Sequence, residues 1–263
     1  MLLPEIDPIA FAIGPVVVRW YGITWAAAFG LIYLLASKNL SKFSKDQLEN
    51  LMFYGLLGAV IGGRIGYMFF YSIEQVILNP LSIFYFWEGG MSFHGGLIGV
   101  LLACFILSKS WGCKFFEIMD FIAPYVPIGL GTVRVGNFLN SELLGKPTEM
   151  PWGVIFPSDP LGLVRHASQL YQAIGEGIIF LLLMIWFSRK PKPLMAVSSM
   201  FLIGYGVVRC LTEIFREPDA HIGFDLLGAI SRGQLLSIPM IIIGLMLLFY
   251  SYKKTQGKDA AIS

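Results

Sequence analysis

Residues 169–192 read QLYQAIGEGIIFLLLMIWFSRKPK, a run of mostly apolar residues that ends in three basic ones. A helix rises about 1.5 Å per residue, so about 20 such residues cross a hydrocarbon layer about 30 Å thick. A strand in lipid would leave its backbone N–H and C=O groups without hydrogen bonds, so the run is expected to be helical. The segment 169–188 therefore predicts a membrane-spanning helix.

Six further segments meet the same criterion. They cover, to within a few residues, 17–37, 48–71, 91–108, 115–135, 194–213 and 233–252. The composition agrees, because 56% of the 263 residues are hydrophobic and only 14% are charged, whereas soluble domains carry about 25% charged residues. A soluble enzyme, a disordered chain and a secreted disulfide scaffold are thereby excluded. We expect an all-α integral membrane protein with seven transmembrane helices in a single domain, 1–263.

The orientation follows from the Lys and Arg residues of the short loops, which concentrate on the cytoplasmic side of a membrane. Eleven of them fall on one side of the predicted spans and four on the other, which predicts an outside N-terminus and a cytoplasmic C-terminus. The eleven are Lys38, Lys42, Lys45, Lys109, Lys114, Arg189, Lys190, Lys192, Lys253, Lys254 and Lys258, and the four are Lys146, Arg165, Arg216 and Arg232.

The loop between spans four and five, residues 136–168, is the only long one. It is rich in Gly, Pro and Asn and contains an apolar stretch at 152–156. We expect it to form a small folded cap on the extracytoplasmic face, within the single transmembrane domain.

Motifs of other function classes do not occur in the sequence. Cys104, Cys113 and Cys210 lie far apart without a CxxC or a paired His, and there is no P-loop, GxSxG or HExxH. The sequence therefore gives no support to a metal finger, a hydrolase, an ATPase or a metalloenzyme, and no nucleic-acid partner is expected. The first fifteen residues lack Lys and Arg, so no cleavable signal peptide is expected.

The arginines are distributed differently from the lysines. Ten of the eleven Lys residues lie on the predicted cytoplasmic side, but seven of the eight Arg residues do not. Arginine presents a planar fork that binds two phosphate oxygens at once, which an ammonium group cannot do. The arginines therefore suggest that a phosphate group is held near the outer face.

The richest polar cluster is GLGTVRVGNFLNSELLG, residues 129–145. If the helix of span four continues, Arg134, Asn137 and Ser141 lie on one face of it, and Asn140 and Glu142 follow closely. An arginine reaching from a helix end to the lipid surface would explain one charge. It would not explain four further polar residues, so we favour a functional site.

A second cluster, in span six, consists of Tyr205, Arg209, Glu213 and Arg216. Spacings of three and four residues place them on one helical stripe at the predicted outer end. An internal Arg–Glu pair that braces two helices is the alternative explanation. The presence of Arg134 at a similar depth favours the functional one.

Single residues at the outer ends of other spans are further candidates. His94, in SFHGG at 92–96, is followed by Gly95 and Gly96, which let another backbone or a lipid approach closely. His166 competes with His94 as the candidate proton acceptor. Tyr21 is expected to lie at the membrane–water interface, as tyrosines at the ends of spans usually do. Arg64 is expected to pair with an acid or contact lipid, and Glu176 in span five to brace helices.

The chain resembles the bacterial prolipoprotein diacylglyceryl transferase family. The resemblance extends over nearly the whole sequence and rests on six motifs in the family's order. They are RWYG at 19–22, SFHGGL at 92–97, RxGNFxNxExxG at 134–145, RHxSQLY at 165–171, GYGxxRxxxExxR at 204–216 and GQLLSIPM at 233–240.

The resemblance implies an enzyme of the bacterial inner (plasma) membrane whose site faces the outer leaflet. Such an enzyme moves the diacylglyceryl group of phosphatidylglycerol to the lipobox cysteine of a preprolipoprotein, forms a thioether and releases glycerol 1-phosphate. The partners expected are the phospholipid, the preprolipoprotein and the bilayer, with no metal or organic cofactor. The implied catalytic residues are His94, Arg134, Arg209 and Glu142, and the implied substrate-binding residues are Arg134, Asn137, Asn140, Tyr21, Gly95, Gly145, Tyr205, Glu213 and Arg216.

The roles expected within this set follow from the chemistry. Arg134 and Arg209 would stabilise the negative charge that grows on the phosphate. Asn137 and Asn140 would hold the glycerol head group, and the acids Glu142 and Glu213 would orient the arginines. His94 is the candidate base, and lowering of the cysteine pKa by the arginines is the alternative.

Two other function classes compete with the enzyme. A lipid transporter or flippase uses buried charges along a path through the bilayer, but it should show polar residues at every depth and two related halves. A phosphatidylglycerol-binding structural protein would need the arginines but not His94. The clustering of charge near one face favours the enzyme.

Overall fold

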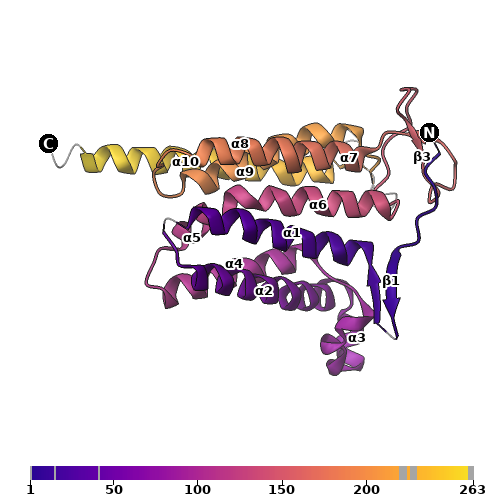
Figure 1. The fold of residues 1–263 in the computed structure, drawn as a ribbon, viewed down its shortest axis with the longest axis horizontal. Helices are drawn as coiled ribbons and strands as arrows, with labels where there is room; N and C mark the ends of the chain where they lie inside the picture. Colours follow the sequence, from indigo (N-terminus) through magenta and orange to yellow (C-terminus); the bar gives the residue numbers. More distant parts are fainter. Residues whose placement is uncertain (1, 15, 41, 219–223, 226–229, 260–263) are drawn as a thin grey trace. The chain divides into compact units, whose positions relative to one another are not determined.

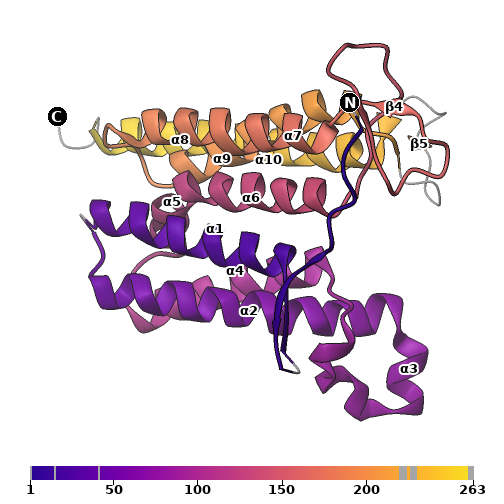
Figure 2. The same ribbon diagram turned by 45° about the vertical axis from the view of Figure 1, so that its right-hand side comes forward.

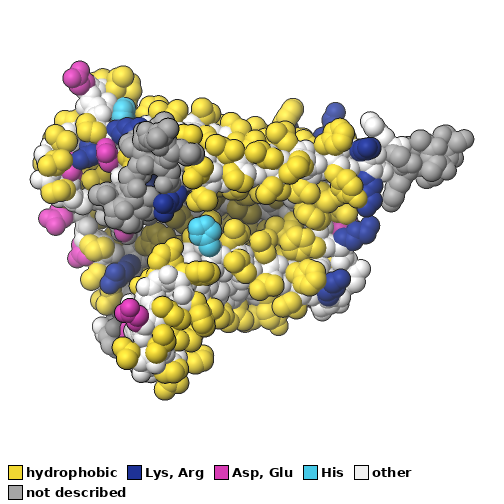
Figure 3. All heavy atoms as spheres, turned by 180° about the vertical axis from the view of Figure 1, so that it is seen from behind, with side chains coloured by type: hydrophobic (Ala, Val, Ile, Leu, Met, Phe, Trp, Pro, Cys, Tyr) yellow, Lys and Arg dark blue, Asp and Glu magenta, His cyan; other side chains and the backbone are white. Residues whose placement is uncertain are grey.

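The computed structural model describes residues 2–14, 16–40, 42–218, 224–225 and 230–259. In this part of the chain, seven helices are long and apolar enough to cross a membrane, which confirms the predicted number (Figure 1). They cover Trp20–Asn39, Lys45–Tyr71, Phe93–Ser110, Phe115–Leu139, Ser168–Ser188, Ala196–Phe215 and Arg232–Gln256. Hydrophobic side chains cover the flanks of the helices (Figure 3), as expected for surfaces that face lipid.

The chain divides into two compact units, residues 33–119 and residues 1–32 together with 120–263. The first unit contains helices α2, α3 and α4 and three short 3₁₀ turns. Their bounds are Lys45–Tyr71 (α2), Ile73–Leu78 (α3), Phe93–Ser110 (α4), Ser37–Asn39 (η1), Pro80–Phe84 (η2) and Phe86–Glu88 (η3). Helix α2 begins with a capping box formed by Ser44 and Gln47.

Helices α2 and α4 pack through glycines. Gly58, Gly62 and Gly66 of α2 face Gly95 and Gly99 of α4, so closely that a β-carbon on Gly62 would lie 2.4 Å from the carbonyl oxygen of Gly95. Small residues are what allow helices to approach closely in a membrane, where apolar side chains gain little from leaving lipid. The glycine spacing of α2 therefore fixes how α4 packs against it.

Arg64 of α2 holds the segment between the second and third spans. Its side chain is 2% exposed. It donates to the carbonyls of Ser82 at 2.7 Å, Ile83 at 3.3 Å and Gly89, and it lies 3.9 Å from Glu88. The ion pair that the sequence left open is present, but the backbone carbonyls of η2 and the turn after η3 are the nearer partners.

The second unit holds the remaining spans. Its helices are α1 (Trp20–Ala36, which begins here), α6 (Val126–Leu139), α7 (Ser168–Gln172), α8 (Phe180–Ser188), α9 (Ala196–Thr212) and α10 (Arg232–Asp259). A π-helical stretch, η5 (Ala173–Ile179), joins α7 to α8, and a 3₁₀ turn, η6 (Glu213–Phe215), follows α9. Helices α8, α9 and α10 run side by side (Figures 1 and 2).

The fourth span is interrupted, although its sequence predicts one continuous helix. Helix α5 (Phe115–Ile122) passes into a 3₁₀ turn, η4 (Ala123–Tyr125), before α6 begins. Pro124 and Pro127 cause this break, because proline has no N–H to donate within a helix. Asp120 of α5 accepts hydrogen bonds from the N–H groups of Met195 and Ser198 and caps the start of α9.

Short antiparallel ribbons supplement the helices that the sequence predicts. They pair β1 (Ile9–Ile13) with β2 (Val16–Arg19), β3 (Val154–Ile155) with β4 (Val164–Arg165), and β5 (Phe224–Asp225) with β6 (Ile230–Ser231). All lie outside the spans, where water can satisfy the edges of a two-stranded ribbon.

The loop between α6 and α7 is folded. Leu3, Val154, Phe156 and Ala167 form a small buried core, against which Phe138 of α6, Leu144 of the loop and Leu170 of α7 pack. Arg165 donates to both carboxylate oxygens of Asp159, at 2.8 and 3.1 Å, and this hydrogen bonding holds the pKa of Asp159 below its usual range. The cap is therefore anchored on the ends of the helices that it joins.

The glycine contact between α2 and α4 can be tested by adding one methyl group. We expect Gly62→Ala to lower the thermal unfolding temperature of the detergent-solubilised protein, because overpacking of this kind costs about 1–3 kcal/mol. Gly55→Ala is the matched control, since no atom lies within 4 Å of a β-carbon at that position of the same helix. It should leave the temperature unchanged or raise it. Equal effects of the two substitutions would contradict the proposed packing.

Candidate functional site

Arg134 lies on α6, one helical turn before Asn137, and its side chain is 15% exposed. Its Nη1 is 3.5 Å from the Asn137 side-chain oxygen, so the predicted shared face is present for this pair. The helix ends at Leu139, and Ser141 adopts a left-handed conformation with φ 53°. The expectation that Ser141 continues the same face is therefore wrong.

Glu142 binds the two asparagines. Its carboxylate accepts from the amide of Asn137 at 3.0 Å and from that of Asn140 at 3.2 Å. The expectation that Glu142 orients the arginines is corrected, because the chain turns at Ser141 and brings this carboxylate back to the end of α6. The side-chain oxygen of Asn140 is buried without a hydrogen-bond partner among the described residues.

Residues 140–146 are held by the start of α7 and the end of α9. Ser168 donates to the carbonyl of Leu143 at 3.1 Å, and the side chain of Gln169 donates to the carbonyl of Glu142. Lys146 N–H donates to the carbonyl of Phe215 at 2.9 Å. Motifs that are far apart in the sequence, at 134–145, 165–171 and 204–216, are thus joined by backbone contacts.

The predicted stripe crosses the end of α9, with Arg209 on α9, Glu213 in η6 and Arg216 directly after η6. Arg209 is 2.8 Å from Glu213, one turn later, and Glu213 is 3.8 Å from Arg216. Both arginines and the acid are nearly buried, with side chains between 5% and 11% exposed. Tyr205, one turn earlier, stacks on the ring of Phe201 with 6.0 Å between the ring centroids.

Glu176 connects the two clusters, and the sequence did not predict this. Its carboxylate lies 3.5 Å from Arg134 and 3.1 Å from Arg209, and it accepts from the hydroxyl of Thr212 at 3.2 Å. The Glu176 side chain has no exposed surface. Glu176 therefore does join helices, as expected, and it does so by pairing with Arg134 and Arg209, the two arginines of the predicted site.

The local backbone explains how Glu176 reaches both neighbours. It lies in the π-helical stretch η5, and glycines precede and follow it. Gly177 faces Gly131 of α6, where an added β-carbon would be 2.7 Å from the Gly131 Cα, and Gly175 faces Val208 and Thr212 of α9. The sequence GEG thus allows close packing against α6 and α9, and such π-helical turns often occur at functional sites.

Five charged side chains therefore form one chain of ion pairs, which we call the ladder. Its members, in order of contact, are Arg134, Glu176, Arg209, Glu213 and Arg216. Their charges alternate in sign from one contact to the next. Buried charges in a membrane protein are expensive unless they are paired, and a ladder of this kind pairs each of them.

The remaining candidates lie at different places. The Tyr21 ring lies against α6, 3.2 Å from where a β-carbon on Gly136 would be, between Arg134 and Asn137 in the sequence. Gly145 packs against the backbone of His166, and the His166 ring is 3.2 Å from the Tyr171 hydroxyl. These positions belong to the same unit as the ladder.

Gly95 and His94 belong to the other unit, 33–119. Gly95 packs against Gly62 and Gly66 of α2, and its assignment to substrate binding stays a prediction. His94 is exposed in the first turn of α4, with its ring beside Phe93.

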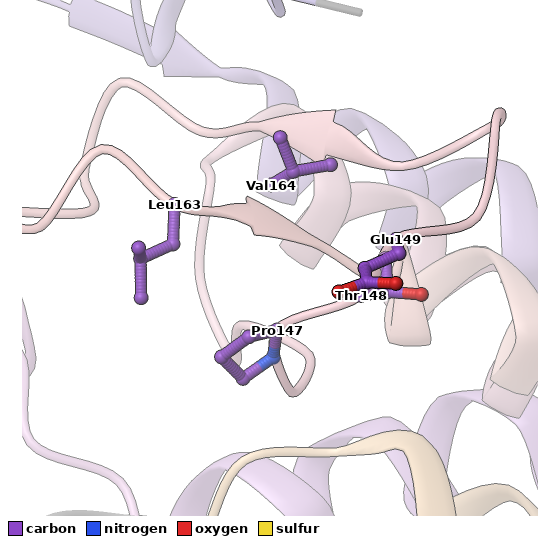
Figure 4. A pocket seen from close by; sticks show the side chains of 5 residues that line it. All are labelled: Pro147, Thr148, Glu149, Leu163 and Val164. Atoms are coloured by element: carbon purple, nitrogen blue, oxygen red, sulfur yellow. The ribbon is translucent and has the colours of Figure 1, made fainter.

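A shallow hollow on the cap contains none of the catalytic candidates. Figure 4 shows the side chains that line it, which are Pro147, Thr148, Glu149, Leu163 and Val164. Because these residues are outside the ladder and carry a single acid, the hollow does not resemble a phosphate site. The candidate site is therefore centred on the ladder.

Comparisons with known proteins identify the family of the chain. The family model described as prolipoprotein diacylglyceryl transferase matches residues 8–250. A phosphatidylglycerol–prolipoprotein diacylglyceryl transferase of Pseudomonas syringae pv. syringae is 49% identical over 264 residues, which cover 98% of each protein. The protein of that name from Acinetobacter baylyi is 48% identical over 257 residues, covering 95% of this chain and 94% of its own. The chain belongs to the prolipoprotein diacylglyceryl transferase family.

Proposed function

We propose that the protein transfers the diacylglyceryl group of phosphatidylglycerol to the lipobox cysteine of a preprolipoprotein. The observation that carries this proposal is the ladder, which holds Arg134 and Arg209 nearly buried and joined by one carboxylate. Two arginine forks at fixed positions suit a phosphate group. Membership of the family and the names of the relatives support the same donor and acceptor.

In the reaction, the cysteine sulfur bonds to the glyceryl carbon that carries the phosphate. The bond between that carbon and the phosphate oxygen breaks, and its electron pair stays on the oxygen, so glycerol 1-phosphate leaves. Negative charge therefore grows on the phosphate. Arg134 and Arg209 meet this charge in an apolar surrounding, where fixed donors act most strongly.

The head group has polar partners at the end of α6. Asn137 and Asn140 are both held through Glu142, and the buried oxygen of Asn140 has an unused capacity to accept a hydrogen bond. A glycerol hydroxyl is the kind of donor that would satisfy this oxygen. We assign the two asparagines to the glycerol of phosphatidylglycerol.

The cysteine must lose its proton, since the thiolate is the nucleophile and a free thiol has a pKa of about 8.5. We assign this step to His94, because a histidine accepts a proton near neutral pH. Stabilisation of the thiolate by the arginines is the competing account. His94 belongs to the unit 33–119 and the ladder to the other unit. Substitution of His94 therefore leaves the residues of the ladder unchanged, so the two accounts can be tested separately.

Transfer itself tests the proposed function. Purified protein in vesicles containing phosphatidylglycerol labelled in its diacylglyceryl part should label a peptide with a lipobox cysteine, and should not label the same peptide with serine in its place. Movement of labelled lipid between leaflets without labelling of the peptide would instead support a transporter. Intact lipid binding without either activity would support a structural lipid-binding protein.

The roles of Arg134 and His94 are separable by pH. Arg134→Lys should lower the transfer rate roughly 100-fold at every pH, because an ammonium group replaces a two-donor fork in the transition state. His94→Gln should lower the rate by a similar factor near pH 7 and recover part of it at higher pH, where more cysteine ionises unaided. The measurement is transfer rate against pH, with phosphatidylglycerol binding as the control. Wild-type rates for His94→Gln throughout would favour the arginine account.

The site is proposed to face the outer leaflet of the bacterial inner membrane. The distribution of Lys and Arg supports this orientation. Accessibility tags at the C-terminus and in residues 42–45 should react only from the cytoplasm, and tags at 148–150 in the cap only from outside. Cytoplasmic labelling of the cap would contradict the orientation and the leaflet together.

A further inference from the structure

The buried face of α7 carries a side-chain amide that no contact of the ladder uses. Gln172 is the last residue of α7, and it is completely buried. Neither its side-chain oxygen nor its side-chain nitrogen has a hydrogen-bond partner among the described residues. An amide that is removed from water without new hydrogen bonds destabilises a folded protein. Such an amide beside a binding site therefore points to a ligand that supplies the missing hydrogen bonds.

Helical spacing places Gln172 between the two parts of the candidate site. Gln169, Gln172 and Glu176 follow one another at intervals of three and four residues, so they project from one face, and all three are completely buried. Gln169 donates to the backbone carbonyl of Glu142, whose carboxylate holds the two asparagines at the end of α6. Glu176 pairs with the arginines of the ladder. The row thus runs from the asparagines to the ladder, with Gln172 in its middle.

The groups left without partners define the chemistry of the ligand. The side-chain oxygens of Gln169 and Asn140 are also buried without a hydrogen-bond partner among the described residues. Amide oxygens only accept hydrogen bonds and the amide nitrogen of Gln172 only donates them. A phosphate group supplies acceptors alone, and an ammonium group supplies donors alone. A hydroxyl group supplies both, so hydroxyls are the groups that suit this region.

We propose that Gln172 binds the terminal glycerol of the donor phospholipid, an assignment that rests on the proposed function. This glycerol carries two hydroxyls on adjacent carbons. One hydroxyl donates to the Gln172 oxygen and the other accepts from the Gln172 nitrogen, since the two atoms lie side by side in the amide. The second hydroxyl then donates its own proton to the oxygen of Asn140 or Gln169. Gln172 thereby selects the head group, while the arginines of the ladder bind the phosphate.

The substitution Gln172→Met separates ligand binding from support of the fold. Methionine fills a similar volume with an apolar, flexible side chain and has only a weak acceptor. Because it removes buried polar groups that have no partner, it should maintain or raise the thermal unfolding temperature of the lipid-free protein. Gln75→Met, at an exposed position of α3, makes the same chemical change outside the site and is the matched control.

The test compares two short-chain lipids by calorimetry on the detergent-solubilised full-length protein, without peptide. They are dihexanoyl phosphatidylglycerol and dihexanoyl phosphatidylpropanol, which has the same chains and the same phosphodiester but neither head-group hydroxyl. The wild-type protein should prefer phosphatidylglycerol roughly tenfold or more. Gln172→Met should lose most of this preference while its affinity for phosphatidylpropanol stays at the wild-type value. Gln75→Met should keep the preference, and Arg134→Lys should weaken the binding of both lipids alike.

An unchanged preference in Gln172→Met would overturn the proposal, and so would an equal loss of affinity for both lipids, which would make Gln172 a support of the ladder. The wild-type protein gives a second test that needs no variant to fold, because equal affinities for the two lipids would also overturn the proposal. None of these binding measurements requires transfer. Failure of the labelled-peptide assay would therefore count against the proposed function alone.

Discussion

Glu176 lies between two guanidinium groups inside an apolar bundle, and the rest of the site depends on this contact. Its three partners, Arg134, Arg209 and Thr212, come from α6 and α9, so the ladder exists only when these helices and η5 are packed together. Removal of one partner of a buried ion pair typically costs about 3–5 kcal/mol, because the other charge stays buried. The same contact that positions the phosphate-binding groups therefore also constrains the helices.

Arginines and acids alternate within the ladder, and in the proposed reaction the arginine donors lie where negative charge develops on the phosphate. Two arginines fixed in advance need no reorganisation as the phosphate gains charge. Glu176 and Glu213 pair with these arginines. The buried arginines are therefore stabilised even when no ligand is bound. The last turn of α6 and its C-cap add the amides of Asn137 and Asn140, which are held by Glu142.

The seven spans could be predicted because span length and apolar composition are local properties of the sequence. The contact of Arg209 with Glu213 could be predicted for a similar reason, since both lie in one span, four residues apart. The role of Glu176 depends on the packing of η5 against α6 and α9, and the spacing of residues along the chain does not predict this packing. The only local feature that marks Glu176 is that it is an acid between two glycines in an apolar segment. The partners of Glu142 also escaped prediction, because the chain reverses at Ser141 in a conformation that serine rarely adopts.

The central claim is that the phosphate of the donor lies against the ladder. Solid-state NMR can measure this directly, by dipolar coupling between the phosphorus of phosphatidylglycerol and nitrogen-15 in the arginine side chains of the protein in vesicles. The account predicts strong coupling to two guanidinium groups, with one set of signals lost in Arg134→Lys and the other in Arg209→Lys. Coupling that survives both substitutions, or that reports only arginines outside the ladder, would contradict it.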